Sequence, residues 1–126
     1  MNVIVVLVGV FFAGMGVFAL AAPAALARPF RIVVEHPESR SEIRAVYGGF
    51  GVATAAALGL ALISPGLHDG ILTAVGCALA GMALGRVVSR VLDRPTAFYP
   101  IWFYALVEIV AAGLLATVVL TRASAT

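Results

Sequence analysis

Charged side chains are scarce in this chain, and lysine is absent. Only 11% of the 126 residues are charged, 63% are hydrophobic, and the mean hydropathy is +1.11. A soluble domain of this length needs a far more polar surface, so the composition excludes a water-soluble globular fold and predicts that lipid solvates the chain. The eight basic residues, all arginines, lie at the borders of apolar runs and form no soluble patch. We therefore expect no nucleic-acid binding.

Cysteine and histidine are also rare. The single cysteine, Cys77, has no partner for a disulfide or a zinc site, and its apolar surroundings predict a buried structural thiol. His36 and His68 fall in different predicted loops on opposite membrane faces, where a lone histidine is usually solvated. A serine–histidine–aspartate set, a phosphate-binding glycine loop and metal-ligand spacing are missing from the sequence. We therefore expect no catalytic residues, no cofactor and no metal site.

Four apolar runs are each long enough for a helix to cross a bilayer, which takes about 20 residues. Because backbone groups in lipid must pair within their own segment, the runs predict helices despite their valines and glycines. The sequence Ala25–Ala27 resembles a signal-peptidase site, but a positive leader is missing, so we expect a retained span. We predict an all-α integral membrane four-helix bundle as one domain over residues 1–126. The predicted spans are approximately 2–27, 41–63, 71–92 and 100–120.

Proline, glycine and charged residues mark the predicted connections between spans. Ser64–Gly70 contains a proline and two glycines and predicts a short turn. Asp93–Pro100 predicts another turn, with Pro100 in the first turn of the fourth helix. In the longer first connection, the spacing of Ser39 and Glu42 predicts a capping box for the second span.

The distribution of arginine predicts the orientation. With four spans, the first and third loops share one side of the membrane, and both termini share the other side with the second loop. Seven of the eight arginines lie on or near the first and third loops, and only Arg122 lies on the other side. Because basic residues concentrate on the cytoplasmic side, we expect loops 28–41 and 93–99 to be cytoplasmic and both termini to be non-cytoplasmic.

Two charged residues interrupt the last two apolar runs. At ~1.5 Å per residue, Glu108 lies roughly 12 Å deep in the fourth span, and Arg86 lies roughly 9 Å deep in the third. Both depths are counted from the same membrane face. An isolated charge in hydrocarbon costs about 2.5–3.5 kcal/mol on insertion scales. Since the two helices are consecutive and antiparallel, we predict an Arg86–Glu108 ion pair.

Helical spacing adds polar neighbours to this pair. One helical turn separates Tyr104 from Glu108, and Ser89 shares a helix face with Arg86. The second span brings a further arginine and tyrosine to a similar level. The predicted polar cluster, a candidate ligand site, contains Arg44, Tyr47, Arg86, Ser89, Tyr104 and Glu108.

Recurring small residues predict which helix faces meet. Glycines at intervals of three or four residues let helix backbones approach closely in lipid. On the second and third spans, the predicted packing positions are Gly48, Gly51, Gly81 and Gly85.

Three segments carry a resemblance to a known family. They are EIRAVYGGFG at Glu42–Gly51, GRVVSRVLDRP at Gly85–Pro95, and the glutamate of YALVE, Glu108. Together they resemble a family of small bacterial four-span membrane proteins known only as a domain of unknown function. The resemblance covers nearly the whole chain and implies a fold and a topology without a biochemical role. It implies a multi-pass protein of the bacterial cytoplasmic (inner) membrane.

Three classes of function remain open. We favour an accessory or scaffold subunit that packs in a larger membrane complex, or a homo-oligomer, because the loops are short and the chain has no soluble domain. The alternative is a small-molecule or proton-coupled transporter, or a ligand-binding bundle, that uses Glu108 and Arg86. The least supported class is a membrane-embedded enzyme acting on a lipid or a quinone, with Glu108 as the acid–base. The charged pair also has a purely structural interpretation, in which it fixes the register of two helices.

Overall fold

The structure, a computed structural model, describes residues 2–125 and is helical almost throughout. Four helices are long and apolar enough to cross a membrane, and the described residues contain no strand. The predicted all-α fold with four membrane helices is therefore confirmed. The elements in chain order are α1 (Asn2–Ala21), α2 (Pro23–Ala27), η1 (Arg28–Phe30), α3 (Pro37–Ile43), η2 (Arg44–Gly49), α4 (Phe50–Ile63), α5 (Pro65–Leu92), η3 (Phe98–Trp102) and α6 (Phe103–Ser124).

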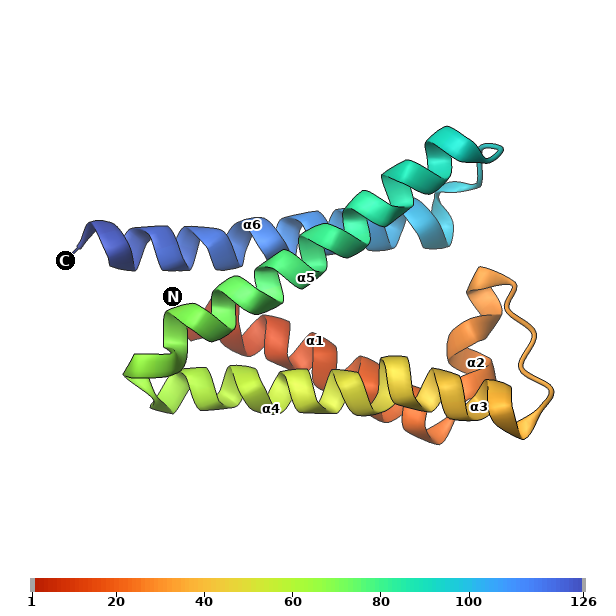
Figure 1. Ribbon diagram of the computed structural model, residues 1–126, viewed down its shortest axis with the longest axis horizontal. Helices are drawn as coiled ribbons and strands as arrows, with labels where there is room; N and C mark the ends of the chain where they lie inside the picture. Colours follow the sequence, from red (N-terminus) through yellow and green to blue (C-terminus); the bar gives the residue numbers. More distant parts are fainter. Residues whose placement is uncertain (1, 126) are drawn as a thin grey trace.

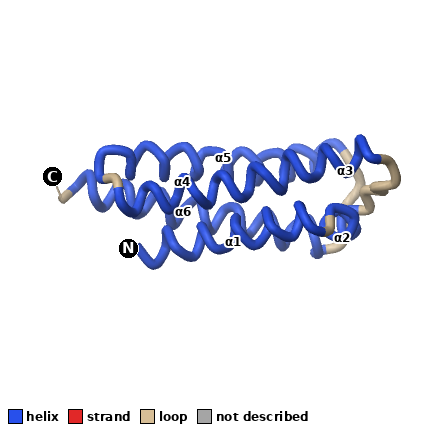
Figure 2. The backbone as a smooth tube through the Cα atoms, turned by 90° about the horizontal axis from the view of Figure 1, so that it is seen from below, coloured by secondary structure: helices blue, strands red, loops and turns tan. Residues whose placement is uncertain are grey.

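The long helices form two pairs. Helix α1 packs along α4 and η2, and α5 packs along α6, while α4 and α5 join the two pairs. Figure 1 shows the pairs close together at the end that carries both termini and diverging toward the opposite end. At that opposite end, η1 reaches from the first pair to contact η3. Figure 2 shows the four helices running side by side along the length of the bundle.

The core lies along the centre of the bundle. On α5, the buried residues His68, Leu72, Val75, Leu79 and Ala83 recur at intervals of three or four and define one helix face. The outer faces keep large apolar side chains exposed, as expected of helices that lipid surrounds. The main core cluster, drawn from all four long helices, contains Val5, Val8, Phe12, Leu58, Ala61, Leu72, Val75, Leu79, Leu115 and Val118.

The first predicted span, residues 2–27, is divided in the structure. Helix α1 ends at Ala21, and Ala22 takes the non-helical angles φ −139° and ψ 67° before Pro23 opens α2. Proline lacks a backbone N–H, and it disfavours helical angles in the residue before it. The apolar run therefore continues past the point where the helix breaks.

Two other predicted boundaries are wrong for a related reason. Helix α5 begins at Pro65, so the predicted turn Ser64–Gly70 is reduced to Ser64. Proline is well tolerated at the first helical position, because the N–H that it lacks has no partner there. The second long helix begins at Pro37 in the same way, with His36 at the N-cap. Ser39 therefore lies inside the helix and does not form the predicted capping box.

The fourth long helix begins two residues before its predicted start at residue 100. It starts at Phe98, and Pro100 lies in its first turn, as predicted. Tyr99 keeps non-helical angles of φ −92° and ψ 134° within that turn. The helix then continues to Ser124, a turn beyond the predicted end at residue 120.

Candidate functional site

Arg86 of α5 and Glu108 of α6 form a two-pronged ion pair, as predicted. The guanidinium Nε donates to Oε1 at 3.1 Å and to Oε2 at 2.9 Å, and Nη2 donates to Oε1 at 2.6 Å. Glu108 is only 4% exposed, and the Arg86 side chain is 22% exposed. Charge-assisted bonds in this forked geometry are among the strongest that side chains make. The carboxylate is thus fully compensated inside the bundle.

Two aromatic rings pack beside the guanidinium of Arg86. Its central carbon lies 5.8 Å from the centroid of the Phe30 ring and 5.9 Å from the centroid of the Tyr104 ring. These two rings are themselves 5.5 Å apart, and Tyr104 also contacts the rings of Tyr99 and Phe103. Cations are attracted to ring faces at such distances. The structure thus confirms Tyr104 as a neighbour of the pair.

Phe30 is a member of this group that sequence reasoning missed. It lies in η1, outside the four predicted spans, and reaches the α5–α6 pair because η1 contacts η3. The only signal in the sequence is its position beside an Arg–Pro dipeptide at the predicted cytoplasmic border. Helical spacing cannot connect a loop residue to a helix pair that lies 56 residues away at Arg86.

Arg44, Tyr47 and Ser89 make their contacts away from the ion pair. The Nε of Arg44 donates to the backbone carbonyl of Leu20 at 3.0 Å and ties η2 to the end of α1. Tyr47 is 36% exposed on the outer surface, and the exposed Ser89 hydroxyl lies 3.5 Å from an Asp93 carboxylate oxygen. The predicted cluster is wrong for Arg44 and Tyr47 because η2 packs against α1, α3 and α4. It is wrong for Ser89 because that exposed hydroxyl faces Asp93 on its own helix end.

Glycines bring α1 and α4 into close contact, as predicted for Gly48 and Gly51. A Cβ atom added to Gly51 would lie 2.9 Å from the Cα of Gly16. One added to Gly48 would lie 2.8 Å from the side chain of Leu20. Gly16, which was not predicted, leaves even less room, since its Cβ would lie 2.6 Å from the backbone nitrogen of Val52. Only glycine permits this backbone approach.

On the outer face of α5, three residues that were predicted to be packed or buried are exposed. Gly81 and Gly85 were expected to pack against another helix, but a Cβ atom on either would meet nothing within 4 Å in the described residues. Cys77, predicted as a buried thiol, is exposed on the same helix. It lies between Val75 and Leu79 in sequence, on the side of the helix away from their core face.

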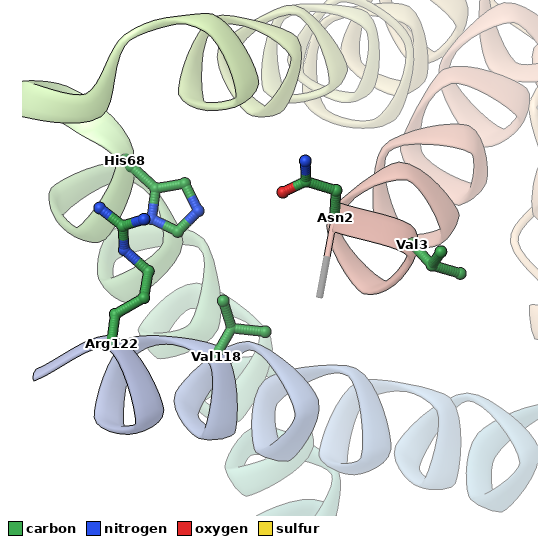
Figure 3. A pocket seen from close by; sticks show the side chains of 5 residues that line it. All are labelled: Asn2, Val3, His68, Val118 and Arg122. Atoms are coloured by element: carbon green, nitrogen blue, oxygen red, sulfur yellow. The ribbon is translucent and has the colours of Figure 1, made fainter. Parts of the chain in front are cut away.

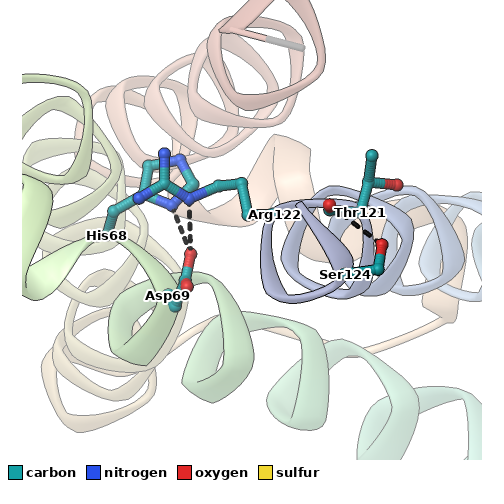
Figure 4. Close-up of polar contacts among 5 residues, drawn as sticks. All are labelled: His68, Asp69, Thr121, Arg122 and Ser124. Carbon is teal, nitrogen blue, oxygen red and sulfur yellow. Dashed lines mark hydrogen bonds and ion pairs between the residues drawn. The ribbon is translucent and has the colours of Figure 1, made fainter. Parts of the chain in front are cut away.

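A second polar group lies at the end of the bundle that carries both termini. His68 is 6% exposed, and its Nδ1 lies 2.7 Å from Oδ1 of Asp69. The Nε of Arg122 donates to the same oxygen at 2.9 Å, so one carboxylate joins α5 to α6 (Figure 4). In the last turn of α6, the Ser124 hydroxyl donates to the Thr121 carbonyl at 3.1 Å. The prediction of a solvated loop histidine is wrong, because α5 begins before His68.

Two hollows lie between α1 and α6. The polar pocket, of about 350 Å³, is lined by Asn2, Val3, His68, Val118 and Arg122 (Figure 3). The apolar groove, of about 400 Å³, is lined by Ile4, Leu7, Val8, Phe11, Phe103, Leu106, Val107, Val110, Ala111 and Leu114. Neither hollow is lined by Arg86 or Glu108. Within residues 2–125, no group of three or more histidine, cysteine or acidic side chains is placed to hold a metal ion.

These features define a small helical protein with four helices able to cross a membrane and an ion pair buried between the last two. Residues 1–119 match the family described as a domain of unknown function, DUF4345, and the chain belongs to that family. Comparison with curated proteins and with solved structures gives no match.

Proposed function

We propose that the protein is an accessory subunit of the bacterial cytoplasmic membrane. In this proposal, the outer face of α5 packs against a transmembrane helix of a larger complex. The observation that supports it most directly is that Gly81 and Gly85 have no packing partner among the described residues. A Cβ atom added to either glycine would have no neighbouring atom within 4 Å. Cys77 extends the same small-residue face by one more turn.

The physical reason lies in how helices associate in lipid. Burial of apolar surface gives little driving force there, so association depends on close packing, and small residues allow the backbones to approach. The chain already uses this means between α1 and α4, where Gly16 and Gly51 bring the two backbones together. Helix α5 presents the same kind of surface, and in this proposal a helix of the partner subunit packs against it.

The test compares substitutions that fill this face with substitutions that fill other open glycines. Gly81→Leu and Gly85→Leu should each abolish co-purification of a stoichiometric partner from the native host in a mild detergent. Gly14→Leu on α1 and Gly113→Leu on α6 are matched controls, because an added Cβ atom at either also meets nothing within 4 Å. These controls should retain the partner.

Two results would contradict the proposal. One is a wild-type protein that purifies as a single monodisperse species, or with only further copies of itself. The other is equal retention of the partner by the α5 variants and by the controls.

A transport or ligand-binding role for the Arg86–Glu108 pair has less support. The two charges satisfy one another through three hydrogen bonds, and Phe30 and Tyr104 pack against the guanidinium. A ligand would have to leave the buried Glu108 carboxylate without its partner, which is strongly unfavourable. The same closed geometry gives Glu108 no access to a lipid or quinone substrate as an acid–base. The pair is better suited to holding α5 and α6 in register.

A further inference from the structure

The seam between α1 and α6 combines the polar pocket with the apolar groove. We use "seam" for the surface that these two hollows form together. Both are walled by the same two helices, and the first turns of α5 close the polar end with His68. Helices α1 and α6 contact each other less than the neighbouring helix pairs do, which leaves this side of the bundle open.

The two hollows follow one continuous face on each helix. On α6, Arg122 and Val118 line the polar pocket, and Leu114 and Val110 follow at intervals of four in the apolar groove. On α1, Val3 in the pocket is followed by Leu7 and Phe11 in the groove at the same interval. A molecule lying along the seam would therefore meet polar groups at one end and only apolar side chains below them.

The polar end presents hydrogen-bond donors in a fixed arrangement. Asp69 binds the Nε of Arg122 and the Nδ1 of His68, but it does not itself line the pocket. The terminal amino groups of the guanidinium remain as donors for a ligand, whereas the Nε2 of the neutral imidazole is an acceptor when its Nδ1–H donates to Asp69. A carboxylate behind a histidine fixes the orientation of its ring. Figure 3 shows the Asn2 amide facing the His68 ring across the pocket.

We propose that the seam binds one anionic phospholipid. Its phosphate would be held by the guanidinium of Arg122 and the side-chain amide of Asn2, and one of its acyl chains would lie in the apolar groove. Guanidinium groups bind phosphate oxygens through forked, charge-assisted bonds. Arg122 stands near the end of a membrane helix, the level at which lipid phosphates and basic side chains meet. The groove volume of about 400 Å³ falls in the range of ligand sites and suits a chain more than a second helix.

The test measures lipid binding to the purified full chain by native mass spectrometry. The probes are dioleoylphosphatidylglycerol, dioleoylglycerol, which lacks the phosphate, and soluble glycerol phosphate, which lacks the chains. The wild type should bind phosphatidylglycerol more tightly than either of the others. Arg122→Gln should weaken phosphatidylglycerol binding about tenfold and leave dioleoylglycerol unchanged. Arg90→Gln, which removes an exposed arginine from the far end of α5, should change neither.

A second pair of variants tests the groove. Leu7→Trp fills it, whereas Val10→Trp places the same side chain at a similarly exposed position on α1 outside it. Leu7→Trp should weaken binding of both diacyl probes, and Val10→Trp should weaken neither. All four side chains are exposed or partly exposed, so the variants should fold, which circular dichroism checks.

Three results would overturn the proposal. They are equal phosphatidylglycerol binding by Arg122→Gln and Arg90→Gln, equal binding by Leu7→Trp and Val10→Trp, or glycerol phosphate binding as tightly as the lipid. The last would assign the pocket to free phosphate esters. The outcome does not depend on the partner proposed for α5, because that surface is a different face of the bundle.

Discussion

Arg86 and Glu108 lie 22 residues apart and meet between α5 and α6 through three hydrogen bonds. The contact fixes the two helices against sliding, because a shift by one turn would separate the charges by about 5.4 Å. It also explains how a carboxylate is tolerated in an apolar run. An unpaired charge at this depth would be costly, and pairing removes much of that cost. The aromatic rings of Phe30 and Tyr104 also pack beside the guanidinium, whose side chain stays 22% exposed.

The contact between α1 and α4 should be sensitive to a single methyl group. Gly16→Ala places a Cβ atom 2.6 Å from a backbone nitrogen of α4, so the two helices must move apart. We expect a loss of about 1–3 kcal/mol in the free energy of unfolding, measured by SDS titration in mixed micelles. Gly14→Ala, two residues away with open space around it, is the control and should be nearly neutral. Equal stability of the two variants would show that α1 and α4 do not pack as described.

Phe30 should contribute to stability although it lies outside the long helices. Phe30→Ala removes one of the two rings that contact the Arg86 guanidinium and should lower the free energy of unfolding by about 1–2 kcal/mol. Phe30→Tyr keeps the ring and should retain most of that energy. Phe98→Ala, at a position 57% exposed, provides a matched loss of a ring at the same end of the bundle. If Phe98→Ala is as destabilising as Phe30→Ala, the proposed packing of η1 on the ion pair is incorrect.

The orientation in the membrane is a separate prediction from the arginine distribution. Seven arginines near the first and third loops, against Arg122 alone on the other side, should place both termini outside the cytoplasm. A C-terminal alkaline phosphatase fusion should therefore be active in bacterial cells, and a C-terminal green fluorescent protein fusion should be dark. The opposite pattern would reverse the orientation and place Arg122 at the cytoplasmic face.

The free-energy cost of an unpaired charge in lipid explains which contact could be predicted from the sequence. The Arg86–Glu108 pair was predictable, because depth can be counted along a helix and an unpaired charge in lipid is expensive. Depth does not determine which helices are neighbours. Arg44 and Tyr47 were therefore placed beside the pair, although η2 packs against α1. Their contacts depend on which face each helix turns toward its neighbours. A helix that is apolar on all sides carries no sequence pattern from which that orientation could be predicted.

Helix starts were the other source of error. A proline can end a helix or occupy its first turn, and the sequence alone favoured the first interpretation at Pro65. In the structure, Pro65 begins α5, which brings His68 and Asp69 into the helix and toward Arg122. The polar pocket was missed for this reason. Gly81 and Gly85 show a further limit of prediction from sequence. Small residues indicate that another helix can approach closely, but they do not indicate which helix it is.

The most direct test of the account is a double-mutant cycle on the ion pair. Arg86→Gln leaves the buried carboxylate unpaired and should cost about 3–5 kcal/mol in the free energy of unfolding. Glu108→Gln should cost less, because the Arg86 side chain is 22% exposed and can turn toward the membrane surface. The variant with both substitutions should recover much of the loss, since neither charge then remains buried alone.

The free energies of all four proteins are measured by SDS titration in the same bilayer-mimicking micelles. A large favourable coupling energy between Arg86 and Glu108 is the result that we predict. Single variants as stable as the wild type, or losses that simply add in the double variant, would contradict a structural role for the pair.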